Sequence, residues 1–441
     1  MGTMNLDVFA CLIFTAAGPP SSSPAHDGWI PGPLPIVIPR PTSMRSQSGM
    51  AKVTDTDARN THVAERVRDA LYGSGRRWHH VVEEAAHGGF TLCAWELLLS
   101  PFSDTTLLVA HVQLPSEDPV GALDEISAAP GGEARGWLVS TLPPGLTLAP
   151  GPRPRLVTHL RWRGEHLPEP VVDPQFVDAL GSWTAIQRWM WFLATGLAPT
   201  TMLPDTEDPD MDDGVVHLSH DWRACVLRNG ATYIALTPDV ADVVTFHDYA
   251  RVYVRSIHLD SLLLGSLQLA ELQKYADRVS GMLDRGLDAA WVEDLETGLM
   301  KLRTGLWWID VANQGRQTSS VLAAFQRQHQ LPRLYAEIVS DLTDVARFVQ
   351  AKQARIQEER DRQSVAQSLR TQHTIALVTF VLFPLTVVYS GAALLNGSAL
   401  GGGRTLALST VVGILIGLTG AAVVRLWRPE SAASTSSPRP K

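Results

Sequence analysis

The chain has 441 residues, of which 45% are hydrophobic and 19% are charged, and its formal net charge is −8. This length is sufficient for two or three domains, and the negative charge provides no basic surface for nucleic acid, so we expect no nucleic-acid partner. The three cysteines, Cys11, Cys93 and Cys225, lie far apart and form no CxxC motif, which argues against a zinc site and a disulfide framework.

Residues 1–50 are predicted to form a disordered, proline-rich tail. The apolar run Val8–Ala17 is short and lacks the preceding basic residue that a secretory signal needs. Eight prolines between Pro19 and Pro41 oppose both helix and sheet. A start codon assigned too early, with Met44 or Met50 as the true start, is an alternative explanation.

Residues 51–236 are predicted to form an α/β cytoplasmic domain. Apolar spacing predicts a helix over Thr54–Leu71 and another over Ser182–Gly196, and Asp118 and Pro119 mark the start of a short helix that ends at Ala128. The runs of β-forming residues predict three strands, at Thr91–Ser100, Thr106–Leu114 and Arg155–Arg163. Asn229-Gly230 predicts a type I′ hairpin turn within Arg223–Leu236.

Two groups of residues in this domain have the composition of metal sites. His79, Glu83 and His87 are four apart, which would place them on one face of a helix. The segment Asp205–Asp213 holds six carboxylates in nine residues. We interpret the first group as a solvent-facing helix end and the second as a solvated acidic loop, because neither has the spacing of a known metal motif. The metal ligands, if any, are unknown.

A helical region is predicted for residues 237–330, and a stalk helix for residues 331–373. Leu331-Pro332 provides a helix start, and neither glycine nor another proline follows before Gln372. Apolar residues at three-, four- and seven-residue spacing form one continuous seam, which is typical of helix packing or of a coiled coil: Leu334, Ile338, Leu342, Val345, Val349 and Ile356.

Residues 374–427 are predicted to form a two-span membrane domain, followed by a cytoplasmic tail at 428–441. Thr374–Gly403 carries no formal charge over 30 residues, and about 20 apolar residues are enough to cross a bilayer. We place the spans at Thr374–Leu395 and Thr405–Val424, with a turn at Asn396–Arg404. Arginine and lysine flank the two spans on the sides away from this turn, which predicts a multi-pass protein of the cell membrane with both termini cytoplasmic.

A pore is the hypothesis for the first span. Thr379, Thr386 and Ser390 share one helix face that Ala393 continues, so these four residues are the predicted pore lining. The alternative is that each hydroxyl bonds to its own helix. In the second span, Gly413 and Gly417 form a GxxxG pattern that is typical of close helix packing.

From Val252 to Trp427, and most clearly from Leu331, the chain resembles the CorA family of divalent-cation channels. The string from Thr379 to Thr386, with its Pro384-Leu385-Thr386, is similar to the family's first span. The resemblance implies an α+β cytoplasmic domain followed by a helical region, a long stalk helix and a two-helix transmembrane hairpin. It also implies a homopentamer whose first span lines the pore.

The pore mouth departs from the family. Where the family carries Gly-Met-Asn, this chain has Ala393-Leu394-Leu395, and Asn396 follows one position later. Leu394, Leu395 and Asn396 are therefore the predicted pore mouth, without the family's hydrated-cation site.

The sequence thus predicts a membrane-embedded, oligomeric cation channel gated by its cytoplasmic domain. The alternative is a membrane-anchored sensor or effector that reuses the same scaffold without selective transport. No catalytic motif is found, so we do not expect an enzyme. No resident cofactor is expected, and Mg²⁺ or another divalent cation would be the transported or regulatory ion.

Overall fold

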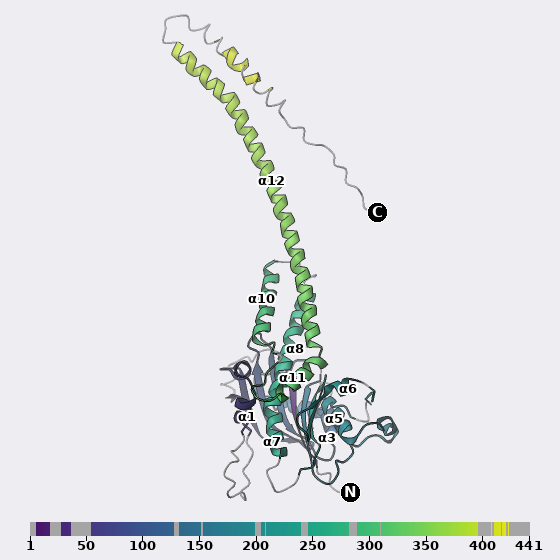
Figure 1. The fold of residues 1–441 in the computed structure, drawn as a ribbon. Coiled ribbons are helices and arrows are strands. Elements are labelled where there is room, and N and C mark those ends of the chain that lie inside the picture. The colour runs from purple at the N-terminus through teal and green to yellow at the C-terminus, as the bar shows by residue number, and fades with distance from the viewer. Residues whose placement is uncertain are drawn as a thin grey trace. The chain divides into compact units, whose positions relative to one another are not determined.

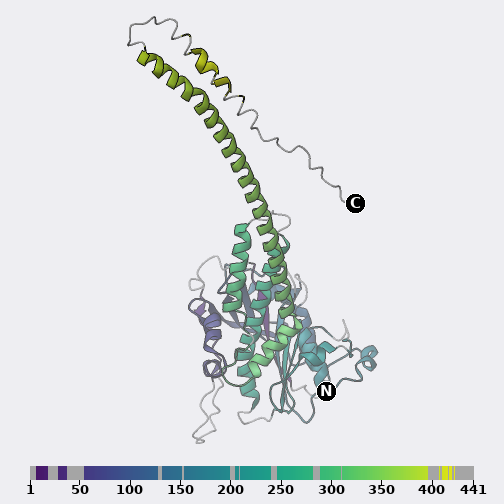
Figure 2. The ribbon, with the colours of Figure 1, turned by 45° about the horizontal axis from the view of Figure 1, so that its top comes forward.

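A computed structural model describes residues 6–17, 28–36, 54–127, 132–150, 153–198, 204–207, 209–239, 246–281, 289–308, 310–395, 407, 410–415, 417–419 and 422. The chain divides into two compact units, Met1–Ala346 and Arg347–Lys441. The first unit contains a mixed sheet with helices packed on it (Figures 1 and 2). The predicted α/β domain and helical region therefore belong to one compact unit.

The described strands of the first unit form one nine-stranded sheet in the order β2-β3-β4-β5-β1-β6-β9-β8-β7. All neighbours pair antiparallel except β6 and β9, which pair parallel. The strands are β1 (Leu6–Thr15), β2 (Ile30–Pro31), β3 (Arg77–His87), β4 (Phe90–Leu99), β5 (Thr106–Gln113), β6 (Arg155–Trp162), β7 (Val215–His217), β8 (Trp222–Leu227) and β9 (Gly230–Ala235).

Helices pack on this sheet, and a π-helical turn, Val254–His258, joins two of them. Helix α8 lies beside α11 (Figure 1), where Gly265 lets the backbone approach the ring of Phe325. The helices are α1 (Asp55–His62), α2 (Glu65–Tyr72), α3 (Pro119–Ser127), α4 (Glu133–Ser140), α5 (Ala185–Thr195), α6 (Pro209–Gly214), α7 (Phe246–Tyr253), α8 (Leu259–Ser280), α10 (Ala289–Gly305), α11 (Gln317–Gln328) and α12 (Leu331–Leu395).

Strand β1 is buried on both faces of the sheet, which explains why its sequence is an almost unbroken apolar run. Its even-numbered side chains, such as Val8 and Leu12, belong to the apolar core that α3, α4 and α5 complete. On the opposite face, Phe9 lies under the guanidinium of Arg255, at 4.1 Å from the ring centroid, and Cys11 lies against His111. The buried ion pairs of Arg59, Arg77, Glu96 and Asp260 lie on this second face.

The disordered tail predicted for residues 1–50 is wrong for its described parts. Residues Leu6–Thr15 form β1, which pairs with β5 on one side and with β6 on the other. Ile30-Pro31 forms β2 at the edge of the sheet. Proline is tolerated in such an edge strand because the missing N–H removes no bond to a second neighbour.

Several predicted elements are confirmed. Strands β4, β5 and β6 lie where β-forming residues predicted them, and α3 begins after Asp118, whose carboxylate accepts from the Gly121 N–H at 2.9 Å. The helix predicted over Thr54–Leu71 is broken in two at Val63-Ala64, because the Ala64 N–H donates to the Val311 carbonyl instead of continuing the helix.

The predicted hairpin is confirmed, but its turn is not of type I′. Leu227 pairs with Gly230, so the turn residues are Arg228 and Asn229, and neither has a positive φ. Gly230 is required for another reason: a Cβ at this position would lie 2.3 Å from the carbonyl oxygen of Leu156 on the neighbouring strand β6.

The predicted transmembrane hairpin is wrong. Among the residues described, none of the helices is both long enough and apolar enough to cross a membrane. Of the predicted second span, Thr405–Val424, the structure describes residues 407, 410–415, 417–419 and 422, which are helical. The prediction relied on an absence of charge over Thr374–Gly403, which is a weaker criterion than the combined length and apolarity of a helix. The predicted multi-pass localisation in the cell membrane depended on these two spans, so it is wrong for the same reason.

The described part of the second unit is mainly helix α12 from Arg347 to Leu395. Residues 351–376 of this helix are all exposed. The Glu358–Arg362 ion pair, at 2.5 Å, links successive turns, as expected for an exposed helix. The predicted turn Asn396–Arg404 and the predicted tail 428–441 lie outside the described residues.

Candidate functional site

The residues predicted to line a pore lie on α12. Thr386 donates a hydrogen bond to the Phe383 carbonyl at 2.8 Å, and Ser390 donates to the Thr386 carbonyl at 2.6 Å. Each hydroxyl is thus bonded to its own helix, which was the alternative to pore lining. Thr379 is exposed on the same helix, Ala393, Leu394 and Leu395 lie at its end, and Asn396 is outside the described residues.

The predicted histidine group is not on a helix. His79, Glu83 and His87 lie on strand β3, which a bulge interrupts between Val81 and Ala85. His79 is buried and contacts the Gly32 carbonyl at 2.9 Å, whereas His87 stacks on Trp137. The four-residue spacing would bring these side chains together only on a helix. The described residues contain no group of three or more histidine, cysteine or acidic side chains that could hold a metal ion.

A chain of ion pairs runs through the interior on the second face of the sheet. Arg59 Nε lies 2.8 Å from an Asp260 oxygen, and Arg77 Nη1 lies 3.1 Å from the other. Arg59 also pairs with Asp55, and Arg77 with Glu96 at 2.8 Å. All five residues are at least 95% buried. Buried charges are tolerated only when they are paired, and here each guanidinium has two carboxylate partners.

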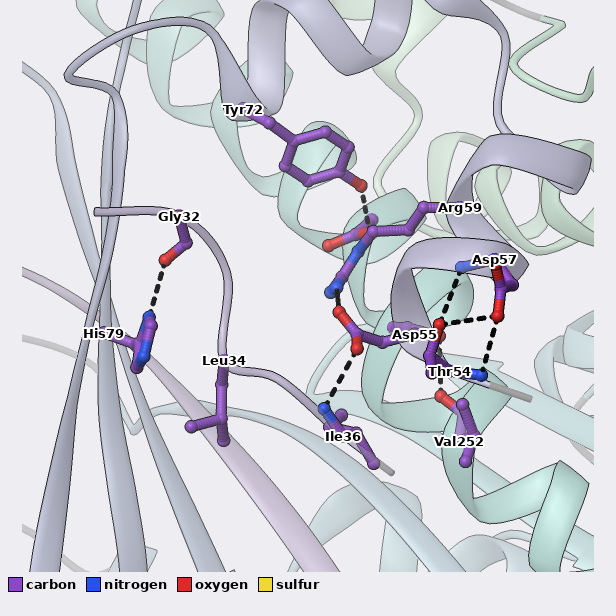
Figure 3. Close-up of polar contacts among 12 residues, drawn as sticks. Gly32, Leu34, Ile36, Thr54, Asp55, Asp57, Arg59, Tyr72, His79 and Val252 are labelled. Atoms are coloured by element: carbon purple, nitrogen blue, oxygen red, sulfur yellow. Dashed lines mark hydrogen bonds and ion pairs between the residues drawn. The ribbon is translucent and has the colours of Figure 1, made fainter. Parts of the chain in front are cut away.

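This charge network also holds a segment of the N-terminal region against the sheet (Figure 3). The Leu34 N–H donates to Glu96 at 2.5 Å, and the Ile36 N–H donates to Asp55 at 3.0 Å. The Tyr72 hydroxyl donates to Asp260. Burial raises the pKa of Tyr72 well above its usual range, with the Asp260 carboxylate acting in the same direction, so the hydroxyl remains a donor.

At one end of the network, three side chains have the connectivity of a nucleophile, a base and an acid. Cys11 Sγ lies 3.4 Å from His111 Nδ1, and His111 Nε2 lies 3.1 Å from Glu96 Oε2. Burial raises the pKa of the Cys11 thiol far above its usual value, and burial also lowers the pKa of His111. Cys11 and His111 are 0% exposed. A protonated thiol that no substrate can reach is a core residue, not a nucleophile.

The charged cavity of the first unit lies elsewhere, at an end of the sheet. It has a volume of about 580 Å³ and is formed by the end of β1, the chain before β6, the β8–β9 turn, α4 and α8. Its lining residues are Ile13, Phe14, Thr15, Arg135, Ala149, Arg153, Pro154, Arg155, Arg228, Asn229, Ala270 and Gln273. We call it the arginine cavity because the part of its lining that the structure describes includes four arginines and no carboxylate.

The sheet brings these arginines together from distant parts of the chain. Arg155 opens β6 and is paired with Ile13 of β1. Arg228 is in the β8–β9 turn, and the next residue, Asn229, accepts a hydrogen bond at 3.0 Å from the N–H of Leu156. The parallel pairing of β6 with β9, which Gly230 makes possible, therefore sets Arg155 and Arg228 at the same end of the sheet.

The positive charge of the arginine cavity is only partly neutralised. Arg153 pairs with Asp124 at 3.2 Å, and Arg135 lies over the ring of Phe14. Within the described chain, neither Arg155 nor Arg228 has an ion-pair or hydrogen-bond partner. Burial lowers the pKa of Arg155, as expected for a guanidinium that loses water without gaining a carboxylate.

The positive charges of Arg155 and Arg228 also act on His329, at the C-terminal end of α11. Burial lowers its pKa to about 3, and the charges of Arg155 and Arg228 act in the same direction. The ring is thus neutral at physiological pH, and its buried Nε2 has no hydrogen-bond partner. A cavity with this excess of positive charge can bind an anion and disfavours a cation.

Sequence reasoning did not find this site. Arg153 and Arg155 stand in a proline-rich stretch, and Arg228 precedes the hairpin glycine. The only signal was the pair of arginines at the start of a predicted strand, and such pairs are common on protein surfaces. The chain matches no family model, no curated protein and no solved structure.

Proposed function

We propose that the first unit is a sensor that binds a phosphorylated small molecule in the arginine cavity. The observation that carries this proposal is a cavity whose lining holds four arginines and no carboxylate. A planar guanidinium donates two parallel hydrogen bonds to a phosphate, which makes arginine the usual residue for phosphate recognition. A bound phosphate would also neutralise Arg155 and Arg228, which have no partner within the described chain.

The size and lining of the cavity support a ligand larger than phosphate alone. Small-molecule sites have volumes of roughly 300–1,000 Å³ and combine apolar walls with a few polar groups. The value of about 580 Å³ falls in this range. Ile13, Pro154 and Ala270 supply apolar wall, and Asn229 and Gln273 supply amides that can orient the ligand.

Binding rather than catalysis is supported by the chemistry of the lining. Among the residues that the structure describes, this lining includes no histidine, cysteine, lysine or carboxylate, and Thr15 is the one hydroxyl. A hydrolase or transferase would need a nucleophile next to a base, or a group that moves a proton. This proposal keeps the sensor part of the alternative derived from the sequence and leaves out the membrane anchor.

Cation transport remains a prediction from the resemblance alone. It requires the two spans corrected above, and the arginine cavity favours a ligand of opposite charge. Assembly into a homopentamer likewise remains a prediction from the resemblance.

Thermal unfolding in the presence of ATP and of sodium tripolyphosphate tests the proposal. Both polyanions should raise the unfolding midpoint of the full chain, because a ligand that binds only the folded state stabilises it. Arg155→Gln should reduce this shift, whereas Arg303→Gln, at an exposed position of α10, should leave it unchanged. Equal shifts in the two variants would contradict the assignment of the site.

A further inference from the structure

A second cavity, of about 340 Å³, lies at the N-terminal end of α11 and is separate from the arginine cavity. Its lining includes His62, His217, Arg316, Gln317, Thr318 and Ser320. We name it the α11 cavity. Its lining, like that of the arginine cavity, includes no carboxylate.

Helix α11 begins without a side-chain cap. Its N-cap position is occupied by Arg316, which makes no capping hydrogen bond. Arginine has no acceptor atom and therefore cannot cap. The first α-helical hydrogen bond at this end is from the Ser320 N–H to the Arg316 carbonyl, at 2.8 Å. The N–H groups of the first turn before it, including those of Gln317 and Thr318, have no helical acceptor.

A buried hydroxyl that has no partner within the described chain lies at this end of the helix. Thr318 lines the α11 cavity and is 2% exposed, and its Oγ1 has no hydrogen-bond partner. An unpaired buried hydroxyl destabilises a fold, so such groups normally have an acceptor. A threonine in the first turn of a helix can donate to an anion that the backbone N–H groups also bind.

The charges around the cavity have the same sign. Arg316 is exposed at the entrance, and the positive end of the α11 dipole faces the same space. The charge of Asp310 acts on Arg316, and this carboxylate already accepts hydrogen bonds from Ser319 Oγ at 2.5 Å and from the Ala312 N–H at 3.3 Å. His62 is held in place by the Gln314 carbonyl at 3.2 Å from Nδ1.

We propose that the α11 cavity is a second anion site, which binds a phosphate group through the first-turn N–H groups of α11, Thr318 Oγ1 and Arg316. Helix N-termini bind phosphate because their free N–H groups and the helix dipole act together. The group can be inorganic phosphate or the phosphoryl end of a larger molecule. The site is independent of the arginine cavity, with which it shares no lining residue.

The test is a calorimetric titration of the full chain with inorganic phosphate and, separately, with glycerol phosphate. Thr318→Val keeps the side-chain shape and removes the hydroxyl, and Arg316→Gln removes the charge. Each should weaken binding at this site by roughly tenfold, the usual effect of losing one hydrogen bond to an anion. Thr318→Val should not lower the unfolding temperature without ligand, because the hydroxyl it removes is unpaired in the described chain.

The two sites are separated by the double variant Arg155→Gln/Arg228→Gln, which removes charge from the arginine cavity only. In that background phosphate should still bind, and adding Thr318→Val should then weaken it. Loss of all phosphate binding in the double variant would overturn the second site and leave the arginine cavity standing. Phosphate affinity unaffected by Thr318→Val and Arg316→Gln in the double variant would also overturn it. Tighter binding of glycerol phosphate than of phosphate would assign the phosphoryl group of a larger molecule.

Discussion

Arg77 on β3 and Asp260 on α8 form an ion pair of 3.1 Å in which both side chains are at most 1% exposed. The two residues are 183 positions apart in the sequence, so the pair joins the sheet to the helical part of the first unit. Asp260 is also the partner of Arg59 at 2.8 Å. The Asp260 carboxylate thus pairs with two buried guanidiniums, each of which has one further carboxylate partner.

Asp260→Asn should therefore destabilise the first unit strongly. The substitution keeps the shape of the side chain and leaves two buried guanidiniums short of one carboxylate, which typically costs about 3–5 kcal/mol. Urea unfolding followed by tryptophan fluorescence measures the change. Glu358→Gln, which breaks the exposed Glu358–Arg362 pair on α12, is the control and should have no measurable effect. Equal stability of the two variants would contradict a structural role for the network.

Removal of residues 1–43 should prevent folding of the first unit. The deletion removes β1, and with it the pairing that connects β5 to β6 in the middle of the sheet. Circular dichroism and limited proteolysis should show loss of the folded sheet. A variant that lacks residues 1–5 keeps β1 whole and should unfold at the same temperature as the full chain. A stably folded protein that starts at Met44 would contradict this role of β1.

Acid should destabilise the first unit below the usual pKa of histidine, 6.5. Burial lowers the pKa of His258 to about 3, so between these two values the unfolded chain binds a proton that the folded chain does not. Stability is therefore complete above pH 6.5 and falls as the pH decreases towards 3, by at most about 1.4 kcal/mol per pH unit for this residue.

His258→Phe should flatten this pH dependence. Neither ring nitrogen of His258 has a hydrogen-bond partner, and the ring stacks on Tyr233 with centroids 5.1 Å apart, so phenylalanine can take its place. Urea unfolding at pH 7 and pH 5 compares the variant with the natural protein. His220→Asn, at a side chain that is 97% exposed, should leave the slope unchanged. An unaltered slope in His258→Phe would show that another group controls the acid response.

Self-association through α12 is a further prediction. Exposed apolar side chains, Ile356, Val365 and Leu369, lie along a stretch of this helix that is surrounded by charged residues. The resemblance to a pentameric family predicts a closed homo-oligomer. Light scattering coupled to size-exclusion chromatography should give a mass several times 48.0 kDa. Ile356→Glu with Leu369→Glu should lower that mass, and a natural protein of 48.0 kDa would exclude the prediction.

Local patterns predicted local structure well. Helix α5 has a capping box between Thr184 and Gln187 and ends at Gly196, whose φ is 62°. The strands β4, β5 and β6 carry β-forming residues in runs of strand length. These elements follow from contacts within a few residues, which the sequence displays directly.

Elements that depend on distant contacts could not be predicted. Residues Leu6–Thr15 resemble a short secretory segment in composition, and only their pairing with β5 and β6 makes them a central strand. His79 and His87 have helical spacing, but residues 77–81 and 85–87 pair with β4, and this pairing determines the local structure. The sequence alone did not predict the arginine cavity, because Arg155 and Arg228 are brought together by the pairing of β6 with β9.

The most direct measurement of the central claim is isothermal titration calorimetry of the full chain with ATP, for the natural protein and for Arg155→Gln/Arg228→Gln. We expect saturable binding to the natural protein that weakens as salt is added, because it depends on charge. The double variant should bind at least about tenfold more weakly, since it loses two charged hydrogen-bond donors. No saturable heat with the natural protein, or equal affinity in the double variant, would contradict the account.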